Sequence, residues 1–141
     1  MHAADSSPGP ASPANAAPLR RILLIAPYGS YRTAAFMQAA RRLRAEIVIA
    51  TQDRCALVEA HNHGLHVDMG DEEAALKTIL EQAQQTPFCA VLGTDDASTA
   101  LAARVSAALS LAHNPLDAVR TARRKDRARA CLARAGVAVP R

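Results

Sequence analysis

Short apolar runs alternate with amphipathic helical stretches along this chain, and no other feature limits its folds as much. The first run, RILLIA at residues 21–26, ends at Pro27 and Gly29, as expected for a strand buried on both faces. Apolar residues at helical spacing follow over residues 33–44, and a second run, EIVIA, occupies residues 46–50. A strand, a helix and a strand within about 30 residues predict a parallel β-α-β unit with a right-handed crossover.

The alternation continues as far as His113. We predict a third strand at 65–68, a helix from about Asp71 to Ala83, a fourth strand at 88–92, a helix around 101–109 and a very short fifth strand at 111–113. Ser30 or Thr33 is expected to cap the first helix, because hydroxyl side chains are favoured at that position. The pattern predicts an α/β fold of the Rossmann-like type, with an open, mostly parallel sheet of four to five strands and helices on both faces.

Composition changes along the chain predict three parts. Residues 1–19 hold four of the eight prolines, with alanine and serine between them, and are expected to form a disordered leader. Residues 20–113 form the predicted α/β domain. Residues 114–141 form a predicted basic helical segment that begins at Asn114, acting as N-cap, and ends at Gly136. The extended apolar tail after Gly136 suggests a chain cut at a domain boundary.

Several protein classes are disfavoured. The cysteines Cys55, Cys89 and Cys131 are odd in number and widely spaced, without a C-x-x-C pair, so we expect free thiols rather than a disulfide framework or a zinc ribbon. We find neither a signal peptide nor an apolar run of membrane-spanning length. A cytoplasmic protein without a membrane partner is therefore predicted.

Two loops at the predicted carboxyl ends of strands are candidate binding sites, because ligands of open parallel sheets bind there. In the first, Gly29, Ser30, Tyr31 and Arg32 are suited to a small anion at a helix N-terminus. The dinucleotide fingerprint and the Walker A loop are both absent from the sequence. A tight turn with surface tyrosines is the alternative interpretation.

The second loop carries Asp95 and Asp96 after Gly93. Paired acids here are able to bind a metal or accept a phosphoryl group, but the first strand lacks the acidic pair of a receiver domain. We therefore favour a helix cap at this position. Three histidines and Cys55 lie further upstream at spacings that match no standard zinc site, so no metal site is predicted: His61, His63 and His66. No catalytic residue is assigned either, since no nucleophile elbow occurs.

The positive charge of the chain is concentrated near its C-terminal end. Residues 117–141 carry eight cationic and two acidic side chains, a net charge of +6, whereas the whole chain carries +4. A solvated helix face and a nucleic-acid patch are both compatible with such a run. Without interleaved aromatics or a known reader motif we predict no nucleic-acid partner. Lys125 is one of only two lysines in the chain.

Three segments in the same order resemble the pre-ATP-grasp domain of ATP-grasp carboxylate–amine ligases, in particular those described as phosphoribosylglycinamide synthetase-like. They are VLGTDDASTALAA at 91–103, LSLAHN at 109–114, which is similar to L-G-L-P-x-N, and the residues that match A-x-x-x-A-R-x-K…R-x-x-L-x-x-A-G-V-x-V-P between Ala118 and Pro140. The loops at 28–32 and 51–55 also resemble that subgroup. The resemblance spans about residues 20–141.

The resemblance implies a function and one site residue. The lysine at the position of Lys125 contacts the ATP phosphates in that family. The family reaction uses ATP and Mg²⁺ to convert a carboxylate into an acyl phosphate, which an amine then attacks. The nucleotide cleft, the magnesium-binding carboxylates and the glycine-rich lid belong to domains C-terminal to this one. The chain is therefore expected to be an inert N-terminal part of such a ligase, with no bound cofactor of its own.

The expected partners are the C-terminal ATP-grasp domain of the same chain and small carboxylate and amine substrates, and a homodimer is left open. Two other functions are kept as alternatives. One is a stand-alone Rossmann-like module that binds a small anion at Gly29 to Arg32. The other is an interaction domain that docks an acidic partner through its basic helix, which strongly salt-dependent binding would support.

Overall fold

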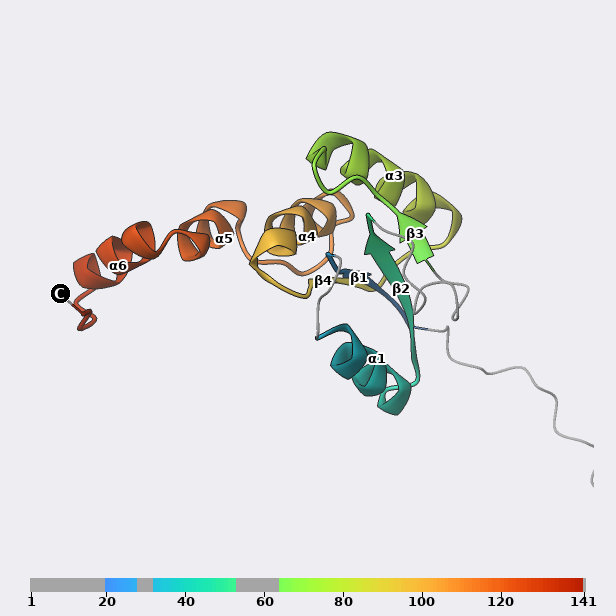
Figure 1. Ribbon diagram of the computed structural model, residues 1–141, viewed down its shortest axis with the longest axis horizontal. Helices are drawn as coiled ribbons and strands as arrows, with labels where there is room; N and C mark the ends of the chain where they lie inside the picture. Colours follow the sequence, from blue (N-terminus) through green and yellow to red (C-terminus); the bar gives the residue numbers. More distant parts are fainter. Residues whose placement is uncertain (1–19, 28–31, 53–63, 141) are drawn as a thin grey trace, which may run out of the picture.

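Four parallel strands form the centre of the protein. The computed structural model describes residues 20–27, 32–52 and 64–140. Its strands are β1 (Arg20–Ile25), β2 (Ala45–Thr51), β3 (Gly64–His66) and β4 (Ala90–Gly93). They lie side by side in the order β3-β2-β1-β4. β1 is therefore an inner strand, and the chain adds β2 and β3 on one side of it and β4 on the other (Figure 1).

Five helices lie within the described residues: α1 (Thr33–Arg42), α3 (Glu72–Gln85), α4 (Asp96–Ala108), α5 (Leu116–Arg123) and α6 (Lys125–Arg134). α1 covers one face of the sheet, and α3 and α4 cover the other (Figure 1). This is the predicted Rossmann-like α/β fold, and the prediction of helices on both faces is confirmed.

Strand periodicity divides the apolar residues between the two faces. Leu23 and Ile25 of β1 belong to the main core together with Ile79 of α3 and Val105 of α4, and all four are fully buried. Leu24 lies between Leu23 and Ile25 and is also fully buried, so its side chain points to the opposite face, the one that α1 covers. Because side chains on both faces of the sheet are buried, the central strands appear in the sequence as runs of apolar residues.

Three ion pairs connect neighbouring elements. Arg21 of β1 donates a hydrogen bond to Glu46 of β2 at 2.7 Å. The two residues lie opposite each other in the parallel register of these strands. Arg104 of α4 donates to Glu72 and Glu73 in the first turn of α3. The hydrogen bonds to Glu73 and Glu72 raise the pKa of Arg104 above its ordinary value. These pairs link β1 to β2 and α3 to α4.

The starts of the helices differ in part from the predictions. Asp71 caps α3 by accepting hydrogen bonds from the backbone amides of Glu73 and Ala74, as its position suggested. Thr33, in contrast, is the first residue of α1, and Arg32 precedes it as N-cap without a side-chain cap bond. Asn114 is not a cap either, because α5 begins one residue later than predicted, after an extended Pro115.

The predicted fifth strand at 111–113 is not present, and the described sheet has four strands. The end of α4 explains this difference. The amides of Ser110 and Leu111 donate back to Ala107 and Ser106, the latter at 2.8 Å, and Ser110 has a left-handed φ of 56°. This is the hydrogen-bond pattern of a Schellman motif. It directs residues 111–113 along the end of α4 instead of along the free edge of β4.

Replacing Ser110 by glycine should therefore stabilise the protein. A left-handed conformation strains every residue that carries a Cβ atom, and glycine adopts it freely. We expect Ser110→Gly to raise the free energy of unfolding by about 0.5–1 kcal/mol. Urea denaturation followed by circular dichroism measures the change, with Ser110→Ala as control because alanine keeps the Cβ atom. An equal gain from both variants would contradict this explanation.

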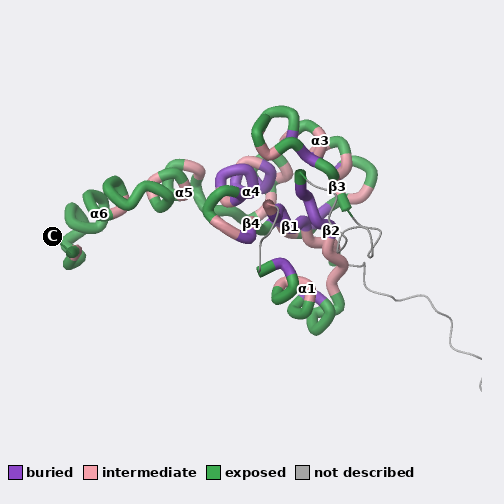
Figure 2. Tube along the Cα trace, in the orientation of Figure 1, coloured by how far each residue is buried: buried purple, intermediate pink, exposed green. Residues whose placement is uncertain are grey.

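The C-terminal helices extend away from the sheet (Figure 1). We call α5 and α6 together, residues 116–134, the basic arm. The chain was predicted to stay helical here, but Arg124 interrupts it with an extended backbone, φ −105° and ψ 102°. Neither helix has a buried residue (Figure 2). Gly136 ends α6 at a φ of +78°, as predicted. No helix of the described residues has the length and apolar character that crossing a bilayer requires.

Candidate functional site

The carboxyl ends of β1 and β4 lie next to each other, because the chain continues from β1 to one side of the sheet and adds β4 on the other. Open α/β sheets bind ligands at such a reversal of strand order. Arg32, which follows β1, donates from Nη1 to the backbone oxygen of Thr94 after β4, at 3.3 Å. The two loops are thereby joined. Gly29, Ser30 and Tyr31 lie outside the described residues, so their predicted role in binding stays a prediction.

The acidic pair after β4 divides into two roles. Asp95 is the N-cap of α4, and its carboxylate accepts from the amides of Ala97 and Ser98. The Ser98 hydroxyl is placed to accept from the Asp95 amide in return, at 3.3 Å, which completes a capping box. Asp95 therefore has the structural role that we favoured. Asp96 is exposed, and its carboxylate takes no part in this cap.

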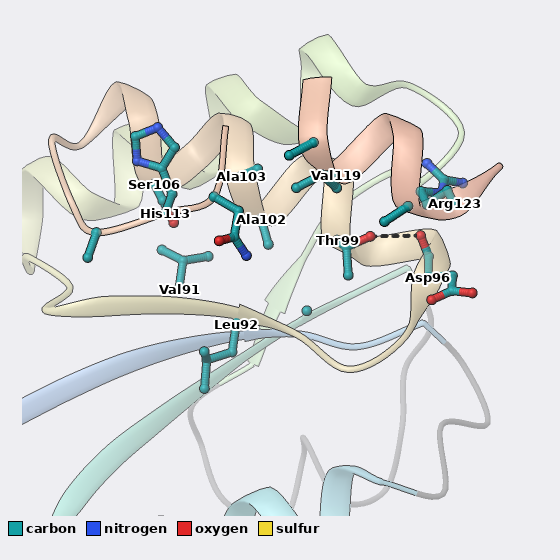
Figure 3. A pocket seen from close by; sticks show the side chains of 15 residues that line it. Val91, Leu92, Asp96, Thr99, Ala102, Ala103, Ser106, His113, Val119 and Arg123 are labelled. Atoms are coloured by element: carbon teal, nitrogen blue, oxygen red, sulfur yellow. Dashed lines mark hydrogen bonds between the residues drawn. The ribbon is translucent and has the colours of Figure 1, made fainter. Parts of the chain in front are cut away.

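A pocket of about 540 Å³ opens beside Asp96. It lies between β4, α4, α5 and the segment that follows α4, and its lining is mainly apolar (Figure 3). The residues that line it are Val91, Leu92, Gly93, Asp96, Thr99, Ala102, Ala103, Ser106, Ala112, His113, Asn114, Ala118, Val119, Ala122 and Arg123. Its volume falls in the range of about 300–1,000 Å³ that is typical of small-molecule sites.

Charged groups gather at one end of this pocket, which we call the charged end. Asp96 and Arg123 lie there, with the Thr99 hydroxyl between them and the apolar lining (Figure 3). Thr99 Oγ1 donates to the backbone oxygen of Asp96 at 3.0 Å, which fixes the hydroxyl on the first turn of α4. At the other end, His113 Nδ1 lies 2.8 Å from the backbone oxygen of Leu111.

Asp96 and Arg123 do not form an ion pair with each other or with any other residue in the part of the chain that the structure describes. Two exposed side chains of opposite charge thus border one mainly apolar pocket. A ligand that carries both an anionic and a cationic group is complementary to this arrangement. A simple anion would instead meet the Asp96 carboxylate beside the arginine.

Lys125, the predicted phosphate contact, is the first residue of α6 and is exposed. It does not line the pocket, and no ion pair involves it within residues 20–27, 32–52 and 64–140. Its neighbour Arg124 pairs with Asp126 at 2.9 Å. The hydrogen bond from Arg124 holds the pKa of Asp126 below its ordinary value, and the pKa of Arg124 is raised by the same bond. Asp126 therefore balances the positive charge of Arg124, the residue that precedes Lys125.

Only one of the three histidines for which no metal site was predicted lies within the described residues. His66 ends β3 and is exposed, whereas Cys55, His61 and His63 lie outside the described ranges. Within those ranges no three His, Cys, Asp or Glu side chains are close enough together to hold a metal ion.

No protein-family model matches the chain. No curated protein matches it by sequence either. Among solved structures, the chain is similar to an L-amino acid ligase from Bacillus licheniformis, with a TM-score of 0.75 and 20% sequence identity. The match covers 86% of this chain but only 31% of the ligase. The likeness establishes a shared fold, and the chain spans less than a third of its structural neighbour.

The charged end of the pocket was not predicted as a site. Arg123 was noted as one of the arginines of the basic segment and as part of the A-R-x-K pattern, without a role in binding, and Asp96 was interpreted together with Asp95 as a helix cap. The position of Asp96, three residues after the end of β4, was the available signal. No sequence pattern indicated that α5 would pack against α4 and bring Arg123 to the same pocket.

Proposed function

We propose that the chain is the N-terminal domain of an ATP-dependent carboxylate–amine ligase of the ATP-grasp type. The observation that carries this proposal is the shared fold with an L-amino acid ligase over 86% of this chain and 31% of that one. Because the chain matches less than a third of that enzyme, we expect it to contribute to the ligase reaction without catalysing it alone. The order of the sequence segments that resemble the pre-ATP-grasp domain supports the same proposal.

In the proposed reaction the terminal phosphoryl group of ATP is transferred to a carboxylate oxygen, and ADP leaves. The amine nitrogen then attacks the carbonyl carbon of the acyl phosphate, loses a proton and displaces inorganic phosphate, which leaves an amide bond. Magnesium would accompany the ATP, and we assign no residue of this chain to it. The residues that hold the adenine and the metal would belong to a following domain of the same polypeptide.

Lys125 is the residue of this chain that we assign to the ATP phosphates. Its ammonium group is a compact charge suited to polyphosphate, and it stands at the start of α6 among Arg123, Arg124 and Arg127. Lys125 is exposed and α6 has no buried residue, so in this proposal Lys125 is accessible to a partner domain. Residues 114–141 would then connect the α/β domain to the ATP-grasp domain.

The test uses the natural polypeptide that contains this chain, assayed for release of ADP and phosphate with carboxylate and amine mixtures. Lys125→Ala should raise the KM for ATP about tenfold or more, the loss of one charge-assisted contact. Lys77→Ala is the matched control, because Lys77 is the other lysine and its side chain is 78% exposed. Equal kinetics for the two variants would remove Lys125 from the site.

The 141-residue chain alone provides the complementary test. It should hydrolyse no ATP above background, since the proposed cleft is elsewhere. An enzyme-like rate from this chain would overturn the ligase-domain proposal. Tight calorimetric binding of phosphate or nucleotide by this chain would favour the stand-alone anion module in its place.

A further inference from the structure

We propose that the ion pair between Arg124 and Asp126 decides between two forms of the basic arm. In the observed form the arm is broken at Arg124, and Lys125 begins α6 (Figure 1). In the other form α5 and α6 join into one continuous helix. Asp126 is thereby a positioning residue for Lys125. That role rests on the proposed function, whereas the choice between the two forms does not.

The sequence of the arm contains nothing that would end a helix at Arg124. Residues 116–135 include neither glycine nor proline and consist mainly of alanine, arginine, leucine and lysine, which are strong helix formers. Neither α5 nor α6 has a buried residue, so burial in the described core does not require the break. A contact at the break itself is therefore the expected cause.

The side chains of Arg124 and Asp126 make such a contact. Arg124 donates from Nε to Asp126 Oδ1 at 3.0 Å and from Nη2 to Asp126 Oδ2 at 2.9 Å. The guanidinium thus holds both carboxylate oxygens, which is a strong and directional geometry. The hydrogen bond from Arg124 also holds the pKa of Asp126 below its ordinary value, so the carboxylate is ionised at neutral pH and the pair is present.

This ion pair is incompatible with a continuous helix. Successive residues of an α-helix lie about 100° apart around its axis, so residues i and i+2 point to opposite sides and do not face each other. Arg124 reaches Asp126 because its own backbone is extended, with φ −105° and ψ 102°. The pair therefore stabilises only the broken form. The continuous form would instead gain the backbone hydrogen bonds that the first turn of a separate helix lacks.

The position of Asp126 favours the broken form for a second reason. Asp126 is the acidic residue in the first turn of α6, where the backbone amides attract a carboxylate. In a continuous helix the same residue would lie far from a helix start, and this attraction would be lost. Asp117 has the corresponding place in the first turn of α5. Substitution of Asp117 therefore removes a first-turn carboxylate without touching the pair at the break, which makes it the matched control.

The two forms place Lys125 differently. A change in ψ of Arg124 from 102° to the helical value of about −42° rotates the chain beyond it by about 140° around that bond. Lys125 is the next residue and is exposed, so the place of its ammonium group relative to the α/β domain changes with the form of the arm. In the proposed function, the broken form is the one that presents Lys125 to the ATP phosphates.

Nuclear magnetic resonance of the 141-residue chain tests the choice between the forms, because the 13Cα chemical shift of Arg124 distinguishes extended from helical backbone. We expect an extended value in the wild type. The shift should move toward the helical value in Asp126→Asn, and further in Asp126→Lys, which also places a cation at the start of α6. Asp117→Asn and Asp117→Lys should leave Arg124 unchanged.

Three results of this experiment would overturn the proposal. One is an Arg124 shift that is already helical in the wild type. Another is an Arg124 that stays extended in Asp126→Lys, since the pair would then not hold the break. The third is an equal change in the two variants of Asp117, because a general effect of first-turn charge would then replace the effect of the ion pair.

Kinetics of the natural polypeptide test the positioning of Lys125. Asp126→Asn should raise the KM for ATP about two- to fivefold, the factor by which an exposed ion pair shifts a conformational equilibrium, and leave kcat unchanged. A role through charge alone predicts the opposite, because loss of a carboxylate beside Lys125 would strengthen the attraction for phosphates. Asp126→Glu keeps the carboxylate and should retain the wild-type KM.

The two experiments separate failure of this inference from failure of the proposed function. If Asp126→Asn makes Arg124 more helical but leaves the KM for ATP unchanged or lowers it, Asp126 does not position Lys125, and the assignment of Lys125 to the ATP phosphates fails. The control of the arm by the ion pair is decided by the resonance experiment alone, because that experiment needs neither ATP nor a following domain.

Discussion

Ile79→Ala is expected to lower the free energy of unfolding by about 2–5 kcal/mol, the range for deleting a fully buried aliphatic side chain. Ile79 lies on the inner face of α3, has no exposed surface and belongs to the core that α3 and α4 form with the sheet. Truncation removes apolar contacts and leaves a cavity among residues that can only partly collapse into it. Because domains of this kind are stable by about 5–15 kcal/mol, the change should be large in a urea titration.

Leu43→Ala is the control for this experiment. Leu43 follows α1 as its C-cap and is 67% exposed, so its truncation should change stability by less than about 0.5 kcal/mol. The two variants remove side chains of similar volume from opposite environments. Similar losses of stability would mean that α3 does not close the core as described.

Gly93→Ala is expected to destabilise the protein by about 1–3 kcal/mol, the usual cost of forcing extra atoms into a packed site. A Cβ atom at Gly93 would lie 2.9 Å from Ser98 Oγ and 3.0 Å from both the carbonyl carbon of Ser98 and the amide nitrogen of Thr99. Two of these atoms are backbone of α4. The helix would therefore have to move away from the end of β4, because no side-chain rotation relieves the contact.

Gly70→Ala is the matched control, since its added Cβ atom would lie 3.1 Å from the flexible side chain of Asp68. Thermal unfolding of both variants gives the comparison. The substitution at Gly93 should also disturb the first turn of α4, where Asp96 and Thr99 line the pocket. If Gly93→Ala were as mild as Gly70→Ala, the close approach of α4 to β4 would not exist in solution.

Most of the fold could be predicted from the sequence, because strands that are buried on both faces of a parallel sheet have apolar residues at successive positions. After their first residues, Arg21 and Glu46, the runs RILLI and EIVIA are entirely apolar since both faces of their strands are covered, and this pattern does not depend on distant contacts. β3 was harder to place. Its strand is only Gly64–His66, ending before the predicted residues 67 and 68, because a short edge strand carries little pattern of its own.

Helix ends were predicted less well, because they depend on backbone conformations that the sequence does not mark. Ser110 and Arg44 adopt left-handed φ values of 56° and 53° without being glycine. A glycine at position 110 would have suggested a turn, as in the L-G-L-P-x-N pattern that residues 109–114 resemble. With serine in that place, the following apolar residues were interpreted as a strand.

The candidate site could be predicted only for the loops that follow strands. Arg32 and Asp96 lie in or next to the connections that follow β1 and β4, so strand prediction was enough to place both at one edge of the sheet. Arg123 required knowledge of the path of the chain after α4, which the Schellman motif at Ser110 and the extended Pro115 determine. Contacts between α4 and α5 are tertiary and have no periodic signature.

α5 and α6 contain no buried residue, so the arm adds little to the buried core of the domain. Cooperative unfolding of a domain reports chiefly on its buried core, so substitutions at exposed arm residues should leave the unfolding transition in place. A change in ligand affinity caused by such a substitution can then be assigned to the ligand itself, without a correction for the fraction of unfolded protein.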